Sequence, residues 1–132
     1  MAQWILRVWN GGNSLLGWIG AQGGAAHFRR LDAVWEVAGG WLIGRLDHAG
    51  WASAITLGDV ILYADAGLIP LLHEHEMAHV RQGRAWGPFF LPAYLLESLF
   101  QWLRTGRGYW DNRFEVAARQ QSAPRVEANG SQ

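Results

Sequence analysis

The stretch LLHEHEMAHVRQ (residues 71–82) gathers titratable side chains in an otherwise apolar part of the chain. Positions 73–79 hold three histidines and two glutamates, although the whole chain has only five histidines. Pro70 precedes the stretch and suits the first turn of a helix, where its missing N–H would have no partner. Gly83 follows and is a common helix stop. These signals predict a helix over about 70–82.

One register of this helix reads H-E-x-x-H, with His75, Glu76 and His79. Positions i and i+4 of a helix lie about 40° apart and one turn along, so both imidazoles can bind a single metal ion. Glu76 lies next to that ligand face, where its carboxylate can take a proton from a water in the metal's open position. His73 lies about 200° from His75 and is expected to point elsewhere. Neither His73 nor Glu74 receives a role from the pattern.

A catalytic zinc site needs a third protein ligand beside the two histidines. The chain has no cysteine, which excludes disulfides and thiolate ligands and leaves His, Asp or Glu. The downstream choices are Glu97, Asp111 and Glu115. Glu97 lies in a strongly apolar segment, where an unpaired carboxylate is costly and a role is expected. Glu115 follows Asn112 by three residues and can instead close a capping box, so the residues alone leave the choice open.

The segments around the motif predict an α+β fold. ASAITL and VILYAD flank Gly58-Asp59, and two β-branched, apolar runs around such a pair predict a β-hairpin. This hairpin would lead directly into the motif helix. Further helices are expected at about 92–103 and at 113–121, the second of them capped by Asn112.

The N-terminal part of the chain gives weaker signals. WILRVW (4–9) is typical of a short strand. Apolar residues recur at helical spacing within 31–38, and the pair Gly39-Gly40 then breaks the pattern. This arrangement predicts a helix followed by an extended piece over 31–46.

Composition limits the class of protein. Half of the 132 residues are hydrophobic and 17% are charged, which is enough for one compact core. Acidic and basic residues balance to a formal net charge of zero, so no nucleic-acid partner is expected. We expect a single domain over 1–119, with its motif-bearing part at about 54–119, and a flexible polar tail over 120–132.

The segment PFFLPAYLLESLFQWL (88–103) is the candidate for membrane contact. At 16 residues, with Glu97 and Gln101 inside it, the segment is shorter than the roughly 20 apolar residues that span a bilayer. It predicts a core helix, with a peripheral membrane contact through 86–103 as the alternative. The N-terminus lacks the shape of a signal peptide because Arg7 interrupts its apolar run, which favours a cytoplasmic location.

Four blocks of the sequence, ITLGDVILY, LLHEHEMAHVRQ, WGPFFLPAYLL and GRGYWDNRFEVAAR, together resemble small bacterial zincin-like domains. Those domains share the ordered patterns HExxHVRQ, WGPxFxPAY and YxxNPFExxAR. The resemblance implies a minimal gluzincin-type metallopeptidase with one zinc ion, in which a glutamate on a second helix completes the site. By that resemblance Glu115 is preferred to Glu97 as the third ligand, beside His75 and His79.

The chain departs from this family at two positions. Arg113 stands where the family usually has proline. Arg119 stands where larger gluzincins often carry an aspartate that supports a ligand histidine, so the group that orients the histidines is not identified. Tyr109, Arg81 and His48 are the candidates for stabilising a developing oxyanion.

Two functions from different classes follow from these patterns. The first is a zinc-dependent hydrolase acting on a peptide or protein, with Glu76 activating a zinc-bound water. An extended substrate would lie along an edge strand, expected at VILYAD (60–65). The second is a non-catalytic zinc-binding or partner-binding module, which is also compatible with a membrane-surface contact.

Overall fold

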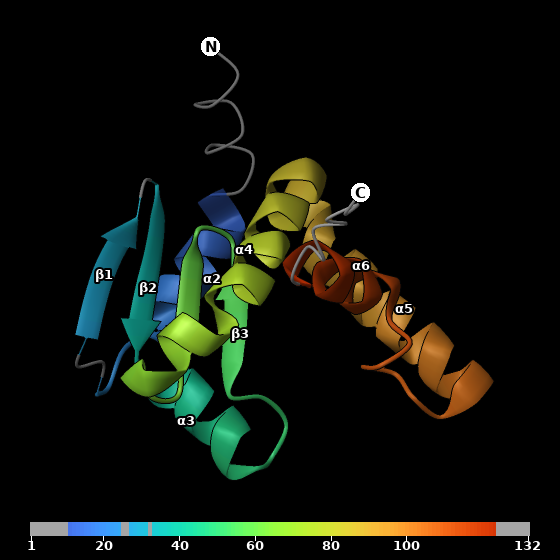
Figure 1. Cartoon of the computed structure of the whole chain (residues 1–132), viewed down its shortest axis with the longest axis horizontal. Coiled ribbons are helices and arrows are strands. Elements are labelled where there is room, and N and C mark those ends of the chain that lie inside the picture. The colour runs from blue at the N-terminus through green and yellow to red at the C-terminus, as the bar shows by residue number, and fades with distance from the viewer. Residues whose placement is uncertain (1–10, 25–26, 32, 124–132) are drawn as a thin grey trace, which may run out of the picture.

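The computed structural model describes residues 11–24, 27–31 and 33–123 and shows an α+β fold built on a four-stranded sheet (Figure 1). The α+β class expected from the sequence is therefore confirmed. In chain order the elements are α2 (Gly11–Gly20), β1 (His27–Leu31), β2 (Val34–Ala38), α3 (Trp41–His48), β3 (Ala54–Leu57), β4 (Val60–Tyr63), a 3-10 turn at Ala66–Leu68, α4 (Ile69–Trp86), a 3-10 turn at Gly87–Phe89, α5 (Phe90–Thr105) and α6 (Arg113–Ser122). The strand predicted at 4–9 lies outside the described residues.

The sheet has the strand order β1-β2-β4-β3. The predicted hairpin is confirmed, because β3 and β4 pair antiparallel with Leu57 opposite Val60 around a turn at Gly58, whose φ is 65°. Strand β4 also pairs with β2 in parallel, so the prediction that 60–65 forms an edge strand is wrong. All four residues of β4 are buried, as expected for an internal strand, and β1 and β3 are the two edge strands.

Helices cover both faces of the sheet (Figure 1). On one face, Ile43 of α3 packs with Val37, Val60 and Leu62 of the sheet, and α2 lies beside α3. On the other face, Val80 of α4 belongs to a separate buried cluster of sheet and helix residues. The motif helix α4 is therefore fixed on the sheet by apolar contacts along one side.

The prediction for 31–46 is wrong in its order of elements. Val34–Ala38 forms strand β2 between β1 and β4, and Trp41–His48 forms helix α3. The apolar run is buried on both faces of the sheet, and such a run has no periodicity that separates strand from helix. The glycine pair is a true boundary, since Gly39 and Gly40 have φ values of 95° and 113° and turn the chain into α3.

The helices of the C-terminal half occur where the sequence predicts them, with different ends. Helix α4 passes through Gly83 and stops at Gly87, which has a φ of 57°, so the predicted stop was one turn too early. The Asn112 side chain accepts a hydrogen bond from the Phe114 N–H at 2.9 Å and caps α6 as expected. Residues 120–122 of the predicted tail belong to α6, while 124–132 lie outside the described residues.

Among the described residues, no helix has both the length and the apolar content needed to cross a bilayer. Helix α5 is 16 residues long and contains Glu97.

Candidate metal centre

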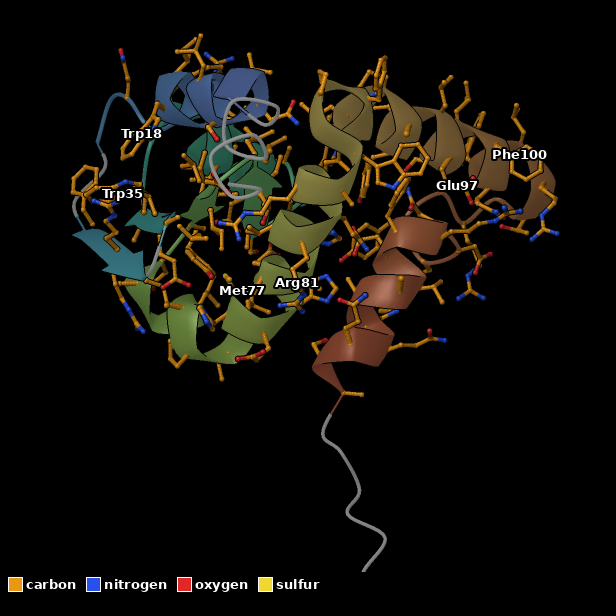
Figure 2. The ribbon with its side chains drawn as sticks, turned by 90° about the horizontal axis from the view of Figure 1, so that it is seen from above. Trp18, Trp35, Met77, Arg81, Glu97 and Phe100 are labelled. Atoms are coloured by element: carbon orange, nitrogen blue, oxygen red, sulfur yellow. The ribbon has the colours of Figure 1, made fainter. Side chains whose placement is uncertain are left out.

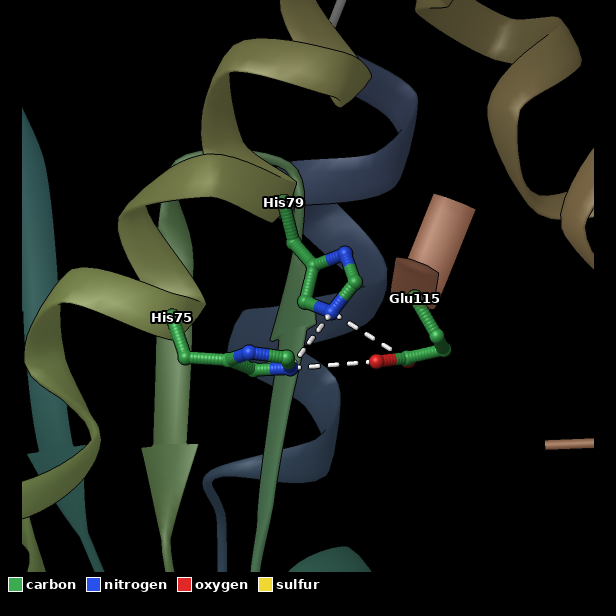
Figure 3. Close-up of side chains that lie close together, drawn as sticks. All are labelled: His75, His79 and Glu115. Carbon is green, nitrogen blue, oxygen red and sulfur yellow. Dashed lines mark hydrogen bonds and ion pairs between the residues drawn. The ribbon is translucent and has the colours of Figure 1, made fainter. Parts of the chain in front are cut away.

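Helices α4 and α6 pack against each other and bring three predicted ligands together (Figure 3). His75 and His79 project from successive turns of α4, and Glu115 projects from the first turn of α6. The Glu115 carboxylate lies 3.0 Å from His75 Nε2 and 3.2 Å from His79 Nε2. The two Nε2 atoms lie 3.2 Å apart. Two segments 40 residues apart in sequence thus converge on one point.

The spacing of these atoms fits a single metal ion. Ligand atoms bound tetrahedrally to zinc at about 2.0–2.1 Å are separated from one another by about 3.3 Å. The donor atoms of His75, His79 and Glu115 all lie within 4.8 Å of one another, with closest approaches of 3.0 to 3.2 Å. Two imidazoles and one carboxylate are a set that zinc accepts, and three protein ligands leave one position open.

Gln82 fixes the form of the His79 ring that a metal requires. The Gln82 Nε2 donates to the Phe114 carbonyl oxygen at 2.8 Å, which leaves Gln82 Oε1 facing His79 Nδ1 at 2.9 Å. An amide oxygen only accepts, so Nδ1 carries the proton and a neutral His79 has a bare Nε2 lone pair directed at the triad. Gln82 therefore fills the orienting role for which the sequence offered no residue, and it also ties α4 to α6.

Glu115 is buried, yet its environment favours the charged form. Burial alone would raise the Glu115 pKa, but hydrogen bonds with His75 and His79 outweigh burial and bring the pKa well below its usual value. The Tyr94 hydroxyl donates at 2.6 Å to Glu115 Oε1, the oxygen that also lies 3.2 Å from His79 Nε2. Burial lowers the His79 pKa. The hydrogen bond and the charge of Glu115 together raise it by a larger amount, so the net shift is upward. Glu115 is thus held ready as an anionic ligand.

Glu76 lies beside the triad and outside the ligand group. Its side chain is 6% exposed, and the Thr56 hydroxyl of β3 donates to Glu76 Oε2 at 2.6 Å. Burial raises the Glu76 pKa, and the charge of His79 and the Thr56 hydrogen bond offset part of this rise. A buried carboxyl of raised pKa next to a metal site has the properties of a proton acceptor and donor.

The structure distinguishes the alternatives for the third ligand. Glu97 accepts from Gln101 Nε2 at 2.8 Å and pairs with Arg113, on the side of α5 that faces α6 (Figure 2). Asp111 accepts from Thr105 in the loop before α6. The Asn112 N–H donates to the Tyr109 carbonyl, so the capping box with Glu115 is not formed. Of the three acidic candidates, Glu115 alone stands with the histidines.

The candidates for oxyanion stabilisation separate in the same way. Burial and then the charge of Glu115 raise the pKa of Tyr109 to about 12, so this half-exposed hydroxyl stays protonated and can donate. Arg81 contacts Gln121 at the exposed side of α4. His48 ends α3, on the opposite face of the sheet. Arg119 stacks on the Trp110 ring, 4.9 Å from its centroid, and donates to the Trp110 carbonyl.

His73 points away from the triad, as the helical geometry predicts. It contacts Glu36 of β2, a fully buried carboxylate that also accepts from the Tyr63 hydroxyl at 3.0 Å. Arg29 of β1 lies 3.6 Å from the second oxygen of Glu36. This polar cluster attaches the start of α4 to the sheet.

Three residues of the site were not found from the sequence: Thr56, Gln82 and Tyr94. Thr56 is the one polar residue in the apolar strand β3, and such an isolated polar residue is a usable signal. Gln82 follows His79 by three residues, which places it on the same helix face. Tyr94 gives no signal of its own, because its role arises only when α5 and α6 meet.

A scan against protein-family models and searches of curated proteins and solved structures found no match to the chain. The positions and contacts of the side chains around His75, His79 and Glu115 are therefore the basis for assigning a function.

Proposed function

We propose that the protein is a minimal zincin-like, zinc-dependent hydrolase that cleaves peptide bonds. The observation that carries this proposal is the combination of a three-ligand set with an adjacent buried carboxyl. His75, His79 and Glu115 would hold the ion and leave a position open, and Glu76 stands next to it without being a ligand. A purely structural zinc site normally has four protein ligands and needs no such neighbour.

The chemistry divides between the ion and the chain. A bound zinc ion supplies polarisation of the scissile carbonyl and lowers the pKa of water. Glu76 takes the proton of the attacking water and returns it to the leaving amine, because its raised pKa suits both steps. Thr56 holds one oxygen of Glu76 and so orients the other. Tyr94 and Tyr109 stay protonated at neutral pH, but the Tyr94 hydroxyl already donates to Glu115, so Tyr109 is the candidate donor for the developing charge.

The sheet topology supports an edge strand as the binding place for an extended substrate. Strand β3 is an edge, and its Thr56 contacts Glu76 directly. An extended peptide that adds to β3 would run past the triad, with its main chain paired to the sheet. This arrangement supports a polypeptide substrate and replaces the strand at 60–65 as the expected binding edge.

The test compares wild-type protein with Glu76→Gln, which is nearly isosteric and cannot accept the proton. Both proteins are loaded with zinc and incubated with a library of fluorescence-quenched peptides, and self-cleavage is followed by mass spectrometry. We expect equal zinc content and a loss of cleavage by about 100-fold or more in the variant. Cleavage at the wild-type rate by Glu76→Gln would refute the assigned role of Glu76.

A non-catalytic metal-binding module is the second candidate, favoured by the burial of the site. The side chains of His75, His79 and Glu115 are 18%, 7% and 4% exposed. An open hollow of about 840 Å³ is lined by residues of α3 and the loop after it, not by the triad. If zinc-loaded wild-type protein cleaves nothing in the library while zinc raises its melting temperature, this second function is preferred.

A further inference from the structure

Helix α5 carries its apolar side chains on the outside. Six large apolar residues of this helix are between 50% and 71% exposed: Leu95, Leu96, Leu99, Phe100, Trp102 and Leu103. At 100° per residue they occupy an arc of about 160° on one side of the helix. A soluble surface helix normally directs such a stripe toward the core.

The opposite side of α5 faces the protein and carries polar groups beside the buried Phe90. Gln101 is 2% exposed and accepts two hydrogen bonds from Arg104, at 3.1 and 3.2 Å. Ser98 accepts from the Asn112 side chain at 2.7 Å, and Glu97 lies toward α6 (Figure 2). Turning α5 to bury its leucines would break the bonds of Ser98 to Asn112 and of Glu97 to the Arg113 N–H, so its outward apolar face is built into the fold.

Helix α2 shows the same reversal with small residues. Gly17 and Gly20 face the protein, and a Cβ on Gly17 would lie 2.7 Å from the Val60 side chain. Leu15, Leu16 and Ile19 point outward and are 62%, 48% and 46% exposed. The described segment 11–24, which contains α2, has no charged residue.

The two helices lie along the same side of the molecule, the upper side in Figure 2. They meet where the Asn13 side chain of α2 donates to the Gly87 carbonyl at 2.8 Å, just before α5. The exposed apolar residues of both helices are called here the α2–α5 surface: Leu15, Leu16 and Ile19 of α2 with the six residues of α5. Exposed apolar surface of this extent marks an interaction site.

We propose that the α2–α5 surface docks the protein onto an anionic lipid bilayer, with both helices lying in the interface plane. The residues at the end of α5 support lipid as the occupant. Trp102 and Trp110 are 59% and 57% exposed, and amphipathic aromatic rings favour the depth of lipid headgroups. Lipid headgroups accept both these aromatic rings and the Arg104 cation at this end of the surface, and lipid is therefore favoured over a second copy of the chain.

Cations gather at the same end and match anionic headgroups. Arg104 is hydrogen-bonded to the neutral Gln101, so no carboxylate neutralises its charge in those contacts. The exposed Arg107 and Arg113 side chains pair with Asp111 and Glu97, so Arg104 is the cation that these contacts leave for a headgroup. Helices with leucine and tryptophan on one side and arginine at the margin bind anionic membrane surfaces without crossing them. This docking is independent of the proposed hydrolase activity.

The test is flotation of the full chain with vesicles of phosphatidylcholine, with and without phosphatidylglycerol. We expect binding to the anionic vesicles, weakened about fivefold by Arg104→Gln and by added salt. The double variant Leu96→Ser/Leu103→Ser should lose binding by at least about tenfold. Leu71→Ser is the matched control, because Leu71 is 76% exposed on α4 outside the α2–α5 surface and should bind as wild type.

Circular dichroism and sedimentation velocity accompany each variant and separate the remaining outcomes. A folded wild-type monomer that floats with neither vesicle overturns the proposal. So does a wild-type dimer that Leu96→Ser/Leu103→Ser converts to monomers without any vesicle binding, since the occupant is then a second copy of the chain. Equal loss of binding in Leu71→Ser would also overturn it, because the effect would not belong to the α2–α5 surface.

Discussion

Helices α4 and α5 follow each other in the chain and depart from the usual distribution of side chains in opposite ways. Helix α4 carries polar and charged groups inward, where Glu76 and His79 are each 6% exposed. Helix α5 carries apolar groups outward, where Leu103 is 71% exposed. Most helices do neither, because burying charge and exposing leucine both cost free energy.

The two departures differ in how they are satisfied within the chain. The inward groups of α4 find partners, since Glu115 meets both histidines and Thr56 meets Glu76. The outward groups of α5 point to solvent. A site whose partners are present in the fold indicates a function that the chain performs itself. An apolar face that residues 11–24, 27–31 and 33–123 leave exposed indicates a contact outside this part of the chain.

The largest expected effect concerns the third ligand and sharpens the difference between the two helices. Glu115→Gln removes an anionic metal ligand and should lower zinc affinity by more than about 100-fold. Loss of a residue that only supports a ligand costs up to about 100-fold, and loss of the ligand itself should cost more. Glu97→Gln is the matched change on α5 and should leave zinc affinity unchanged, because Glu97 contacts Gln101 and Arg113. Competition with a chromophoric chelator measures both. Equal losses in the two variants would contradict the assignment.

A smaller effect is expected at Gln82, which acts on the metal through His79. Gln82→Ala removes the acceptor that keeps the Nδ1 proton in place and should weaken zinc binding by about 10- to 100-fold. Gln82→Glu restores an acceptor and should recover most of the affinity, although it loses the donor to Phe114. If both variants bind zinc as tightly as wild type, Gln82 is only a surface contact between α4 and α6.

The pH dependence of zinc binding tests whether His79 of α4 is coupled to Glu115 of α6. Glu115 raises the His79 pKa above its ordinary value of 6.5, so in the metal-free protein a proton competes with the metal already above pH 6.5. Affinity should therefore fall by up to about tenfold per pH unit as the pH drops through that pKa. The Glu115 pKa is lowered, so its protonation contributes nothing in this range. Calorimetric zinc titrations in buffers from about pH 5 to 8, around the ordinary histidine pKa, measure this dependence. Zinc affinity would not change with pH if no histidine binds the metal.

The smallest expected effect is the change in folding stability caused by Leu99→Ser on the outer face of α5. Leu99 is 51% exposed, so Leu99→Ser should change the free energy of unfolding by no more than about 0.5 kcal/mol. Phe90 on the inner side of α5 is 3% exposed, and Phe90→Ala should cost about 3–5 kcal/mol. Urea denaturation measures both. A large loss in Leu99→Ser would mean that the outer face of α5 is covered within the chain itself.

Local signals in the sequence predicted much of the C-terminal half. The hairpin at 54–63 depends on a Gly-Asp turn between β-branched runs, and the cap of α6 depends on Asn112, both of which act over a few residues. The triad could be proposed from a spacing on one helix plus a resemblance. Glu115 was separated from Glu97 by the resemblance, and the structure places Glu115 with the histidines.

The errors arose where tertiary contacts decide the outcome. Val34–Ala38 became a strand because β1 and β4 flank it on both sides, which no local pattern states. The predicted edge strand at 60–65 is internal for the same reason, and β3 lies at that edge of the sheet. The outward face of α5 was expected to be core, because hydrophobic periodicity identifies a stripe without telling which way it points.

The metal content of the purified protein tests the central claim most directly. Wild-type chain, loaded with zinc and dialysed, should retain about one ion per molecule by elemental mass spectrometry. His79→Ala should retain none, while His73→Ala, the same change on the same helix outside the triad, should retain the wild-type amount. Circular dichroism confirms that each protein is folded. A folded wild-type protein that remains metal-free, or a His79→Ala variant that keeps its zinc, would contradict the metal centre.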